Sequence, residues 1–322
     1  MPSPSTDQLS IDIVNEEIDE DQYINEVKLL EVIHNKNVSI IPDQDGNVHT
    51  ISAPIHAKNG REELTAKGDG LSFDFSEQPN KDGLYELDLE FDRSDLTDKA
   101  KLILNVKNTS WSGYVLQEWY GLFGSGLEAN QERMAKRSAE ELNEWRKDQG
   151  ISMSVFVKTG EKWVFQQDIN VVGNTVSRDI VIPIDLTAVE GDITQIKLVA
   201  GFKLWEIDFA QLDYSDNEAV SIRELETTLT QNDDDKDIAS DDKLYRHLQY
   251  GDTLSLNYEL RSPNSNQSAS YVLKTKGYYD KHFNQDGSMA VREVMSFKKK
   301  GQMSLYSRYL MENMFSEIEA ID

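Results

Sequence analysis

Residues 85–92 alternate strictly between apolar and acidic side chains, and this pattern constrains the fold more than any other feature of the chain. Four apolar residues share one face of an extended strand, and four acidic residues share the other: Tyr85, Leu87, Leu89 and Phe91, against Glu86, Asp88, Glu90 and Asp92. A strand of this kind buries one face, which is typical of antiparallel sheets with one side toward solvent.

Similar segments follow along the chain and predict seven further strands, at 102–106, 153–157, 163–168, 179–184, 193–199, 202–209 and 220–225. Eight short strands of this type favour a mainly β fold, a two-sheet sandwich of jelly-roll type. One long interruption, at 111–148, has helical spacing and is rich in Glu, Ala, Lys and Arg. We interpret it as a helical hairpin inserted in the sandwich, joined at Gly121, Gly124 and Gly126.

The remaining segments predict smaller units on either side of the sandwich. Short strands at 9–14, 27–34, 38–41 and 48–52 indicate a β-rich N-terminal unit over 1–83, and the sandwich then occupies 84–226. Residues 43–47, between the last two of these short strands, have the composition of a hairpin turn. The charged run within 227–243 predicts an acidic linker. Beyond it, strands at 253–260 and 270–276 and a helix at 303–318 indicate a small α+β C-terminal unit over 244–322.

The charge balance excludes several classes of partner. With 58 acidic and 33 basic residues, the formal net charge is −25, and such a field repels nucleic-acid phosphates and anionic membrane surfaces. No apolar run approaches the roughly 18 residues of a membrane-spanning helix. Cationic partners, divalent metal ions and neutral ligands such as glycans remain compatible with this charge, although solubility alone also accounts for it.

The chain lacks the sequence signatures of the common catalytic sites, so we predict no catalytic residue. It contains no cysteine, which removes disulfides, thiolate metal sites and cysteine nucleophiles, and no G-x-S-x-G motif. Its five histidines are scattered. Residues 124–129 match G-x-G-x-x-A, but a helix precedes this segment where a dinucleotide site requires a strand, which favours an interhelical turn.

The sharpest carboxylate pair is Glu206 and Asp208, within a predicted strand. Residues two apart on a strand share a face about 6.5 to 7 Å apart, while Trp205, Ile207 and Phe209 turn to the opposite layer. The pair is therefore a candidate contact for a cation or a ligand. A glycan-active hydrolase that uses this or another carboxylate pair is the enzymatic alternative.

Calcium is the one cofactor for which the sequence offers ligands, because hard oxygen donors occur in two segments. Neither segment has the EF-hand spacing, so the prediction is a calcium site of another type, with these candidate ligands: Asp43, Asp45, Asn47, Asp233, Asp235 and Asp237.

Aromatic residues in the helical insertion offer a second route to ligand binding. Trp and Tyr rings stack on apolar sugar faces while neighbouring acids and amides bind hydroxyl groups. Four rings lie close together before the glycine turn, and at helical spacing they form either a recognition surface or part of the core: Trp111, Tyr114, Trp119 and Tyr120. We call them the aromatic stripe.

Four segments, at 23–34, 108–114, 178–185 and 201–208, resemble pieces of an uncharacterised family of bacterial, exported, multidomain proteins. The resemblance implies a jelly-roll similar to galactose-binding-like modules, without transferring the role of any residue. The Ser/Pro-rich start also resembles the tether that follows the processed end of an exported protein, and a native cytosolic start is the alternative. We therefore expect an exported, periplasmic or cell-surface, non-enzymatic binding or assembly module for a glycan or protein partner. A purely structural envelope component is a further alternative, and the oligomeric state is not set by the sequence.

Overall fold

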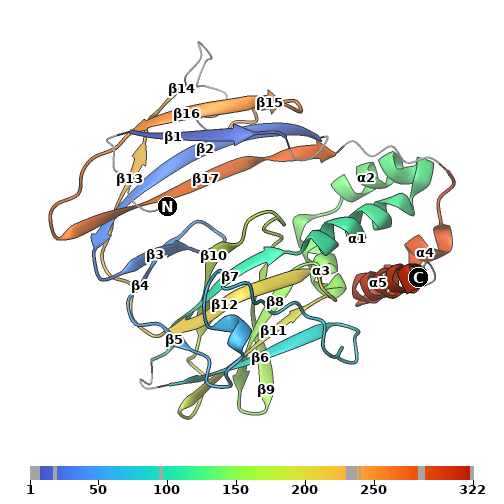
Figure 1. The fold of residues 1–322 in the computed structure, drawn as a ribbon, viewed down its shortest axis with the longest axis horizontal. Coiled ribbons are helices and arrows are strands. Elements are labelled where there is room, and N and C mark those ends of the chain that lie inside the picture. The colour runs from blue at the N-terminus through green and yellow to red at the C-terminus, as the bar shows by residue number, and fades with distance from the viewer. Residues whose placement is uncertain are drawn as a thin grey trace. The chain divides into compact units, whose positions relative to one another are not determined.

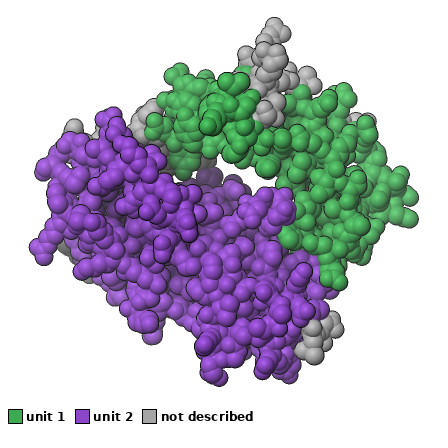
Figure 2. Space-filling model, turned by 180° about the vertical axis from the view of Figure 1, so that it is seen from behind, with its two compact units in different colours: residues 1–40, 48–52, 216–284 green, residues 41–47, 53–215, 285–322 purple. Residues whose placement is uncertain are grey.

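The computed structural model describes residues 8–16, 20–93, 97–229, 238, 241–281 and 287–319. It is mainly β, with 43% strand and 21% helix, and its strands pair antiparallel in several sheets, which confirms the predicted fold class (Figure 1). The chain divides into two compact units, coloured separately in Figure 2. Unit 1 contains residues 1–40, 48–52 and 216–284, and unit 2 contains residues 41–47, 53–215 and 285–322.

Unit 2 is built on two four-stranded antiparallel sheets, as expected from residue 84 onward. The first has the order β10 (Arg178–Asp185), β7 (Lys99–Asn108), β12 (Trp205–Asp213) and β5 (Ile55–His56). The second has the order β6 (Tyr85–Asp92), β11 (Ile193–Ala200), β8 (Met153–Thr159) and β9 (Lys162–Ile169). A short 3-10 turn, η1 (Glu62–Leu64), lies in the segment that leads into the second sheet.

The alternation that predicted β6 determines how this strand packs. Leu87, Leu89 and Phe91 are almost fully buried. On the opposite face Lys197 of β11 forms ion pairs with Glu86 and Asp88. Burial of one face provides the driving force for packing, and the acidic face stays toward solvent with its charge partly balanced.

The insertion between β7 and β8 contains three α-helices where the sequence predicted two. They are α1 (Ser110–Gly121), α2 (Leu127–Ala135) and α3 (Ala139–Gln149), with the 3-10 turn η2 (Gly124–Gly126) after α1. The additional break comes from Ser138, which caps α3 through a reciprocal capping box with Glu141. This S-x-x-E signature stops α2 and starts a new helix because the serine side chain binds the free backbone N–H group.

The C-terminal helices α4 (Val291–Ser296) and α5 (Gln302–Glu319) belong to unit 2. Two buried serines of α5 bind the chain between β11 and β12: Ser304 accepts from the Phe202 N–H group, and Ser307 donates to the Phe202 carbonyl. Before the helix, Gly301 has a φ of +70°, and a β-carbon there would overlap the carbonyl oxygen of Asp82. Glycine at this position allows the close approach that seats α5.

Unit 1 is a smaller pair of antiparallel sheets. One has the order β1 (Gln8–Val14), β16 (Thr253–Glu259) and β14 (Thr227–Leu229). In the other, β2 (Glu20–Asn35) pairs with β17 (Gln267–Lys281), β13 (Ser221–Leu225) and β15 (Arg246–Leu248). Both sheets contribute to one hydrophobic cluster, which includes Leu29, Leu256, Tyr258 and Tyr271.

This division differs from the domains predicted along the sequence. The N-terminal strands do not form a unit of their own, because β1 and β2 pair with strands that follow residue 220. The predicted C-terminal unit is split as well, since its strands lie in unit 1 and its helix lies in unit 2. Ile238, within the predicted linker, is buried in the core of unit 1. Strand pairing between distant segments, which no local pattern reports, decides the division.

The hairpin of β3 (Ser39–Pro42) and β4 (Val48–Ile51) was predicted from its turn residues. These strands pair with each other across residues 43–47, and Gly46 has the positive φ of +84° that the turn requires. Among the helices that the structure describes, none is long and apolar enough to cross a membrane.

A buried ion pair links β7 and β12 in unit 2. Lys101 and Asp213 face each other in the strand register, and Lys101 Nζ lies 3.5 Å from an oxygen of Asp213. Both side chains are almost completely shielded from solvent. The Ser215 N–H group also donates to Asp213 at 2.8 Å.

We expect Asp213→Asn to destabilise unit 2 by about 3–5 kcal/mol, because it removes one charge of a buried ion pair. The measurement is urea unfolding followed by tryptophan fluorescence, which reports on unit 2 since all 5 tryptophans lie there. Asp92→Asn is the matched control, because Asp92 forms an exposed ion pair with Lys58 at 2.9 Å. Its cost should stay below about 1 kcal/mol, and equal costs for the two variants would contradict the prediction.

Candidate functional site

The aromatic stripe predicted on the helical insertion is divided between surface and core. Tyr114 is 37% exposed, and its ring lies 5.1 Å from that of the half-buried Trp111. Trp119, in contrast, is buried, and Tyr120 is partly buried beside it. Of the four rings, only Tyr114 is exposed, Trp111 and Tyr120 are partly buried, and Trp119 is buried.

Trp119 holds three helical segments together. Its ring contacts Phe123 after α1, Trp145 of α3 and Phe297 after α4, with centroids 5.2, 5.5 and 6.0 Å away. Its indole N–H group has no hydrogen-bond partner among the described residues. The packing makes Trp119 a core residue, which is one of the two interpretations that the sequence left open.

Tyr306 of α5 lies near Tyr114 of the aromatic stripe, and Tyr309 lies beside Tyr306. Trp111 of α1 donates from Nε1 to Ser307 at 2.9 Å, which joins the two helices. One position earlier, Tyr306 contacts Phe297 at 5.4 Å and Tyr309 at 6.5 Å between ring centroids. Burial, with smaller contributions from Glu118 and Tyr114, raises the pKa of Tyr306 to about 12. The sequence predicted a helix at 303–318 without singling out these rings.

One face of α5 is buried near the start of the helix and becomes exposed toward its end. Met303, Ser304 and Ser307 are fully buried. The next residues on the same face are Leu310 and Met311, which are partly exposed. They are followed by Met314, 40% exposed, and Phe315, 59% exposed. We call Leu310, Met311, Met314 and Phe315 the α5 stripe.

Spacings of three and four residues place these side chains above one another on a helix. Charged residues lie elsewhere around α5, where Arg308 and Glu312 form an ion pair at 2.7 Å. One face of α5 therefore continues along the helix, buried at Met303, partly covered at Leu310 and Met311, and exposed among the described residues at Met314 and Phe315.

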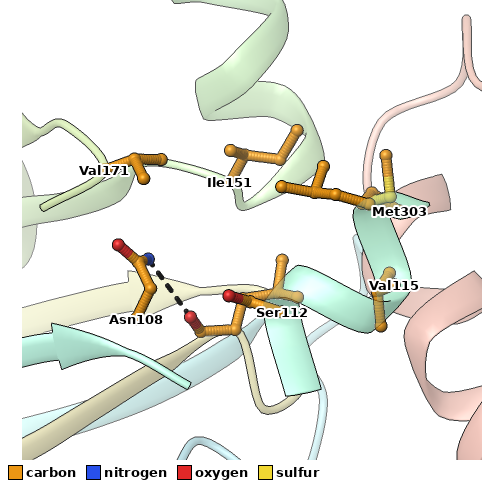
Figure 3. Close-up of a pocket in the computed structure, with 8 residues that line it drawn as sticks. Asn108, Ser112, Val115, Ile151, Val171 and Met303 are labelled. Atoms are coloured by element: carbon orange, nitrogen blue, oxygen red, sulfur yellow. Dashed lines mark hydrogen bonds between the residues drawn. The ribbon is translucent and has the colours of Figure 1, made fainter. Parts of the chain in front are cut away.

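A small cavity lies beneath α1 (Figure 3). Its volume is about 20 Å³, and its walls are mainly apolar, formed by Asn108, Ser112, Val115, Leu116, Ile151, Val171, Leu204 and Met303. The polar groups of Asn108 are occupied, because its amide donates to the Leu204 carbonyl and accepts from the N–H groups of Val172 and Gly173. A space of this size holds about one water molecule, so we do not interpret it as a ligand site.

The predicted carboxylate pair is separated by a β-bulge. Lys107 pairs with Glu206, and Asn105 pairs with Phe209, so that Asp208 is the additional residue on β12. The bulge interrupts the expected alternation and turns Phe209 to the face opposite Ile207. Each carboxylate has its own partner: Glu206 lies 3.5 Å from Lys107 Nζ, and Asp208 accepts from the Gly68 N–H group at 2.8 Å.

The oxygens of the first predicted calcium segment serve the hairpin turn. Asp43 Oδ1 accepts from the backbone N–H groups of Asp45 and Asn47, and Oδ2 accepts from the Asn47 side chain. In the ranges that the structure describes, no group of three or more His, Cys, Asp or Glu residues is placed to hold a metal ion. The calcium site stays a prediction, and its other candidate ligands lie outside the described residues: Asp233, Asp235 and Asp237.

A second aromatic cluster, absent from the sequence-based predictions, lies on unit 1. It contains Tyr23, Tyr245, His247 and Tyr278, which we call the aromatic row. The sequence carries a faint signal for it, because Tyr245 and His247 are two residues apart and thus share a strand face. The sequence does not indicate that Tyr245 and His247 lie near Tyr23, which is more than 200 positions earlier.

Comparison with known proteins adds no functional assignment. A scan against protein-family models found no match, and a search of curated proteins also found none. The functional interpretation therefore rests on the geometry of the α5 stripe and the aromatic row.

The pKa of Tyr306 leads to a prediction about alkaline stability. The pKa of Tyr306 is about 12 in the folded protein, whereas an ordinary tyrosine has a pKa of about 10. Between pH 10 and pH 12 the unfolded chain binds fewer protons than the folded protein does, so the free energy of unfolding falls as the pH rises. We expect the free energy of unfolding of Tyr306→Phe to decrease less steeply with pH in this range than that of the wild type.

The phenolate difference spectrum between wild type and Tyr306→Phe should show a midpoint near pH 12. A midpoint near 10, the ordinary value for tyrosine, would contradict the packing of Tyr306 against α1.

Proposed function

We propose that this protein is a non-enzymatic assembly module that binds a protein partner through the α5 stripe. The observation that carries the proposal is the continuity of one helix face. The face is buried in the first half of α5 and exposed at Met314 and Phe315 in the second half.

Exposed apolar side chains are costly when they gather on one surface. Single exposed apolar residues are common, but contiguous ones on a soluble protein mark interaction sites. Transfer of a Met or Phe side chain from water into a contact contributes roughly 1.5–3 kcal/mol. Binding that covers Met314 and Phe315 would therefore stabilise a complex substantially.

The chemistry of the stripe indicates what kind of partner fits it. Amphipathic helices associate through apolar residues spaced three and four apart, which is the spacing of the α5 stripe. Methionine adapts its shape to different partners, and Met311 and Met314 supply two of the four side chains. The net charge of −25 favours a partner with a positive surface around its apolar contact.

The location of this assembly is part of the proposal. The resemblance to exported, multidomain bacterial proteins favours a partner in the cell envelope. In this setting the antiparallel sandwich of unit 2 is a rigid support for the helices, since α5 is fixed to it through Ser304 and Ser307.

Site-specific photo-crosslinking tests the proposal. A photoreactive phenylalanine analogue at Phe315 should form a covalent adduct with one envelope protein when the module is incubated with bacterial envelope extract. The same analogue at Ser316 is the control, because it lies next in sequence but points away from the α5 stripe. We expect the adduct from position 315 to disappear when Met314 is replaced by Ser.

Three outcomes would contradict this function. Equal adducts from positions 315 and 316 would indicate random collision. An adduct with the mass of two copies of this chain would assign the stripe to self-association. The absence of an adduct at both positions would remove the α5 stripe as a binding surface.

A further inference from the structure

The aromatic row crosses three strands of unit 1. In the strand register Tyr23 of β2 lies between His247 of β15 and Tyr278 of β17. The rings of His247 and Tyr278 both stack on Tyr23, with centroids 4.7 Å away and interplanar angles of 8° and 13°. Ile24, the next residue, points into the core of unit 1, so the row occupies the opposite face of this sheet.

A β-bulge beside the row brings a fourth ring to it. The pairing of β2 with β17 shifts between Lys276 and Gly277, which leaves Asn25 as an additional residue on β2. A β-carbon at Gly277 would overlap the carbonyl oxygen of Tyr23. Glycine thus permits the close strand approach that aligns Tyr23 with Tyr278.

The bulge also holds the segment that carries Tyr245. Asn25 donates its amide to Asp241, and Asp241 in turn forms an ion pair with Lys276. The hydrogen bond from Lys276 keeps the pKa of the Asp241 carboxyl below its usual value. These contacts fix the chain before Tyr245, whose ring then meets Tyr278 at 5.2 Å.

Asn25 has a polar atom without a partner in this arrangement. Its side chain is 1% exposed, and its Oδ1 accepts no hydrogen bond from any described residue. A buried carbonyl oxygen without a donor costs about 1–3 kcal/mol. Unsatisfied buried polar atoms often occur at functional sites, and Asn25 is two residues from Tyr23 of the aromatic row.

The rings present two kinds of surface to a ligand. Tyr23 is stacked between His247 and Tyr278, so it offers mainly its edge and its hydroxyl group, whereas His247 and Tyr278 each have one face covered by Tyr23. Tyr245 is turned by 76° relative to Tyr278 and does not continue the stack. It is 38% exposed, and Tyr278 is 52% exposed, so both are accessible to a molecule that approaches this face.

Hydrogen-bonding groups surround the rings. Asp21 binds His247 Nε2 at 2.9 Å, and the charges of Asp21 and Asp280 add to burial in raising the pKa of Tyr23. Carboxylates accept hydrogen bonds from hydroxyl groups, and phenol groups both donate and accept them. A ring face flanked by such groups is suited to a sugar, which has an apolar C–H face and a hydroxyl rim.

Other ligand classes fit this surface less well. Phosphate and other anions are repelled by the acidic side chains around the row and by the net charge of −25. A quaternary ammonium group needs several ring faces turned toward one point. In the aromatic row three of the four rings are stacked in a line and do not surround one point.

We propose that the aromatic row is a binding site for neutral carbohydrate, with Tyr245 stacking on a sugar ring and the hydroxyls of Tyr23 and Tyr278 binding its rim. The site lies wholly within unit 1, and it does not depend on the α5 stripe, which belongs to unit 2.

Affinity electrophoresis tests this site. The full-length protein is run through native gels that contain one neutral polysaccharide each: a β-glucan, an α-glucan, a xylan or a galactomannan. We expect at least one polysaccharide to slow the wild type. Tyr245→Ala and Tyr278→Ala should each weaken that interaction at least tenfold, whereas Tyr245→Phe should retain it within about threefold, because the ring face is preserved.

Tyr279→Ala is the matched control. Tyr279 follows Tyr278 on the same strand and is 60% exposed, but strand alternation places it on the opposite face of the sheet. Its replacement should leave the migration unchanged. Circular dichroism of each variant separates loss of binding from loss of fold.

Either of two results would overturn the proposal. If none of the four polysaccharides slows the wild type, the aromatic row only stabilises the sheet. If Tyr279→Ala weakens binding as much as Tyr278→Ala does, the carbohydrate binds elsewhere on unit 1.

Discussion

The pairing of strand β2 with strands from the far end of the chain is the constraint on which the rest of the structure depends. β2 hydrogen-bonds with β13, β15 and β17, all of which follow residue 220. Closing so long a loop costs conformational entropy, although that cost grows only slowly with loop length. The long register between β2 and β17, which covers residues 20–35, provides the hydrogen bonds and buried side chains that offset it.

This pairing makes unit 2 an insertion within unit 1. The chain leaves unit 1 after β4, forms both sheets and the helices of unit 2, and returns at residue 216. It leaves once more after β17, and α5 completes unit 2 by contacts of Ser304 and Ser307 with Phe202. Each unit is therefore built from separate segments of the sequence, and neither is one continuous piece of chain.

The α5 stripe and the aromatic row arise from different physical causes. The α5 stripe exists because a helix continues its apolar periodicity beyond the residues that cover it, which leaves Met314 and Phe315 in solvent. The aromatic row exists because a bulge at Asn25 and a glycine at position 277 align rings on neighbouring strands. One surface suits a protein helix and the other suits a small hydroxylated ligand, so the two proposed activities are compatible in one molecule.

The sequence by itself determined the local elements. Alternation in β6 identified a strand with one buried face, and turn residues identified the β3–β4 hairpin, because both depend on neighbouring residues. Tertiary structure alone decided which strands share a sheet, that Trp119 is core while Tyr114 is exposed, and that a bulge separates Glu206 from Asp208. It also brought Tyr23 beside His247 and Tyr278. These features depend on contacts between residues far apart in the chain, and local periodicity carries no information about such contacts.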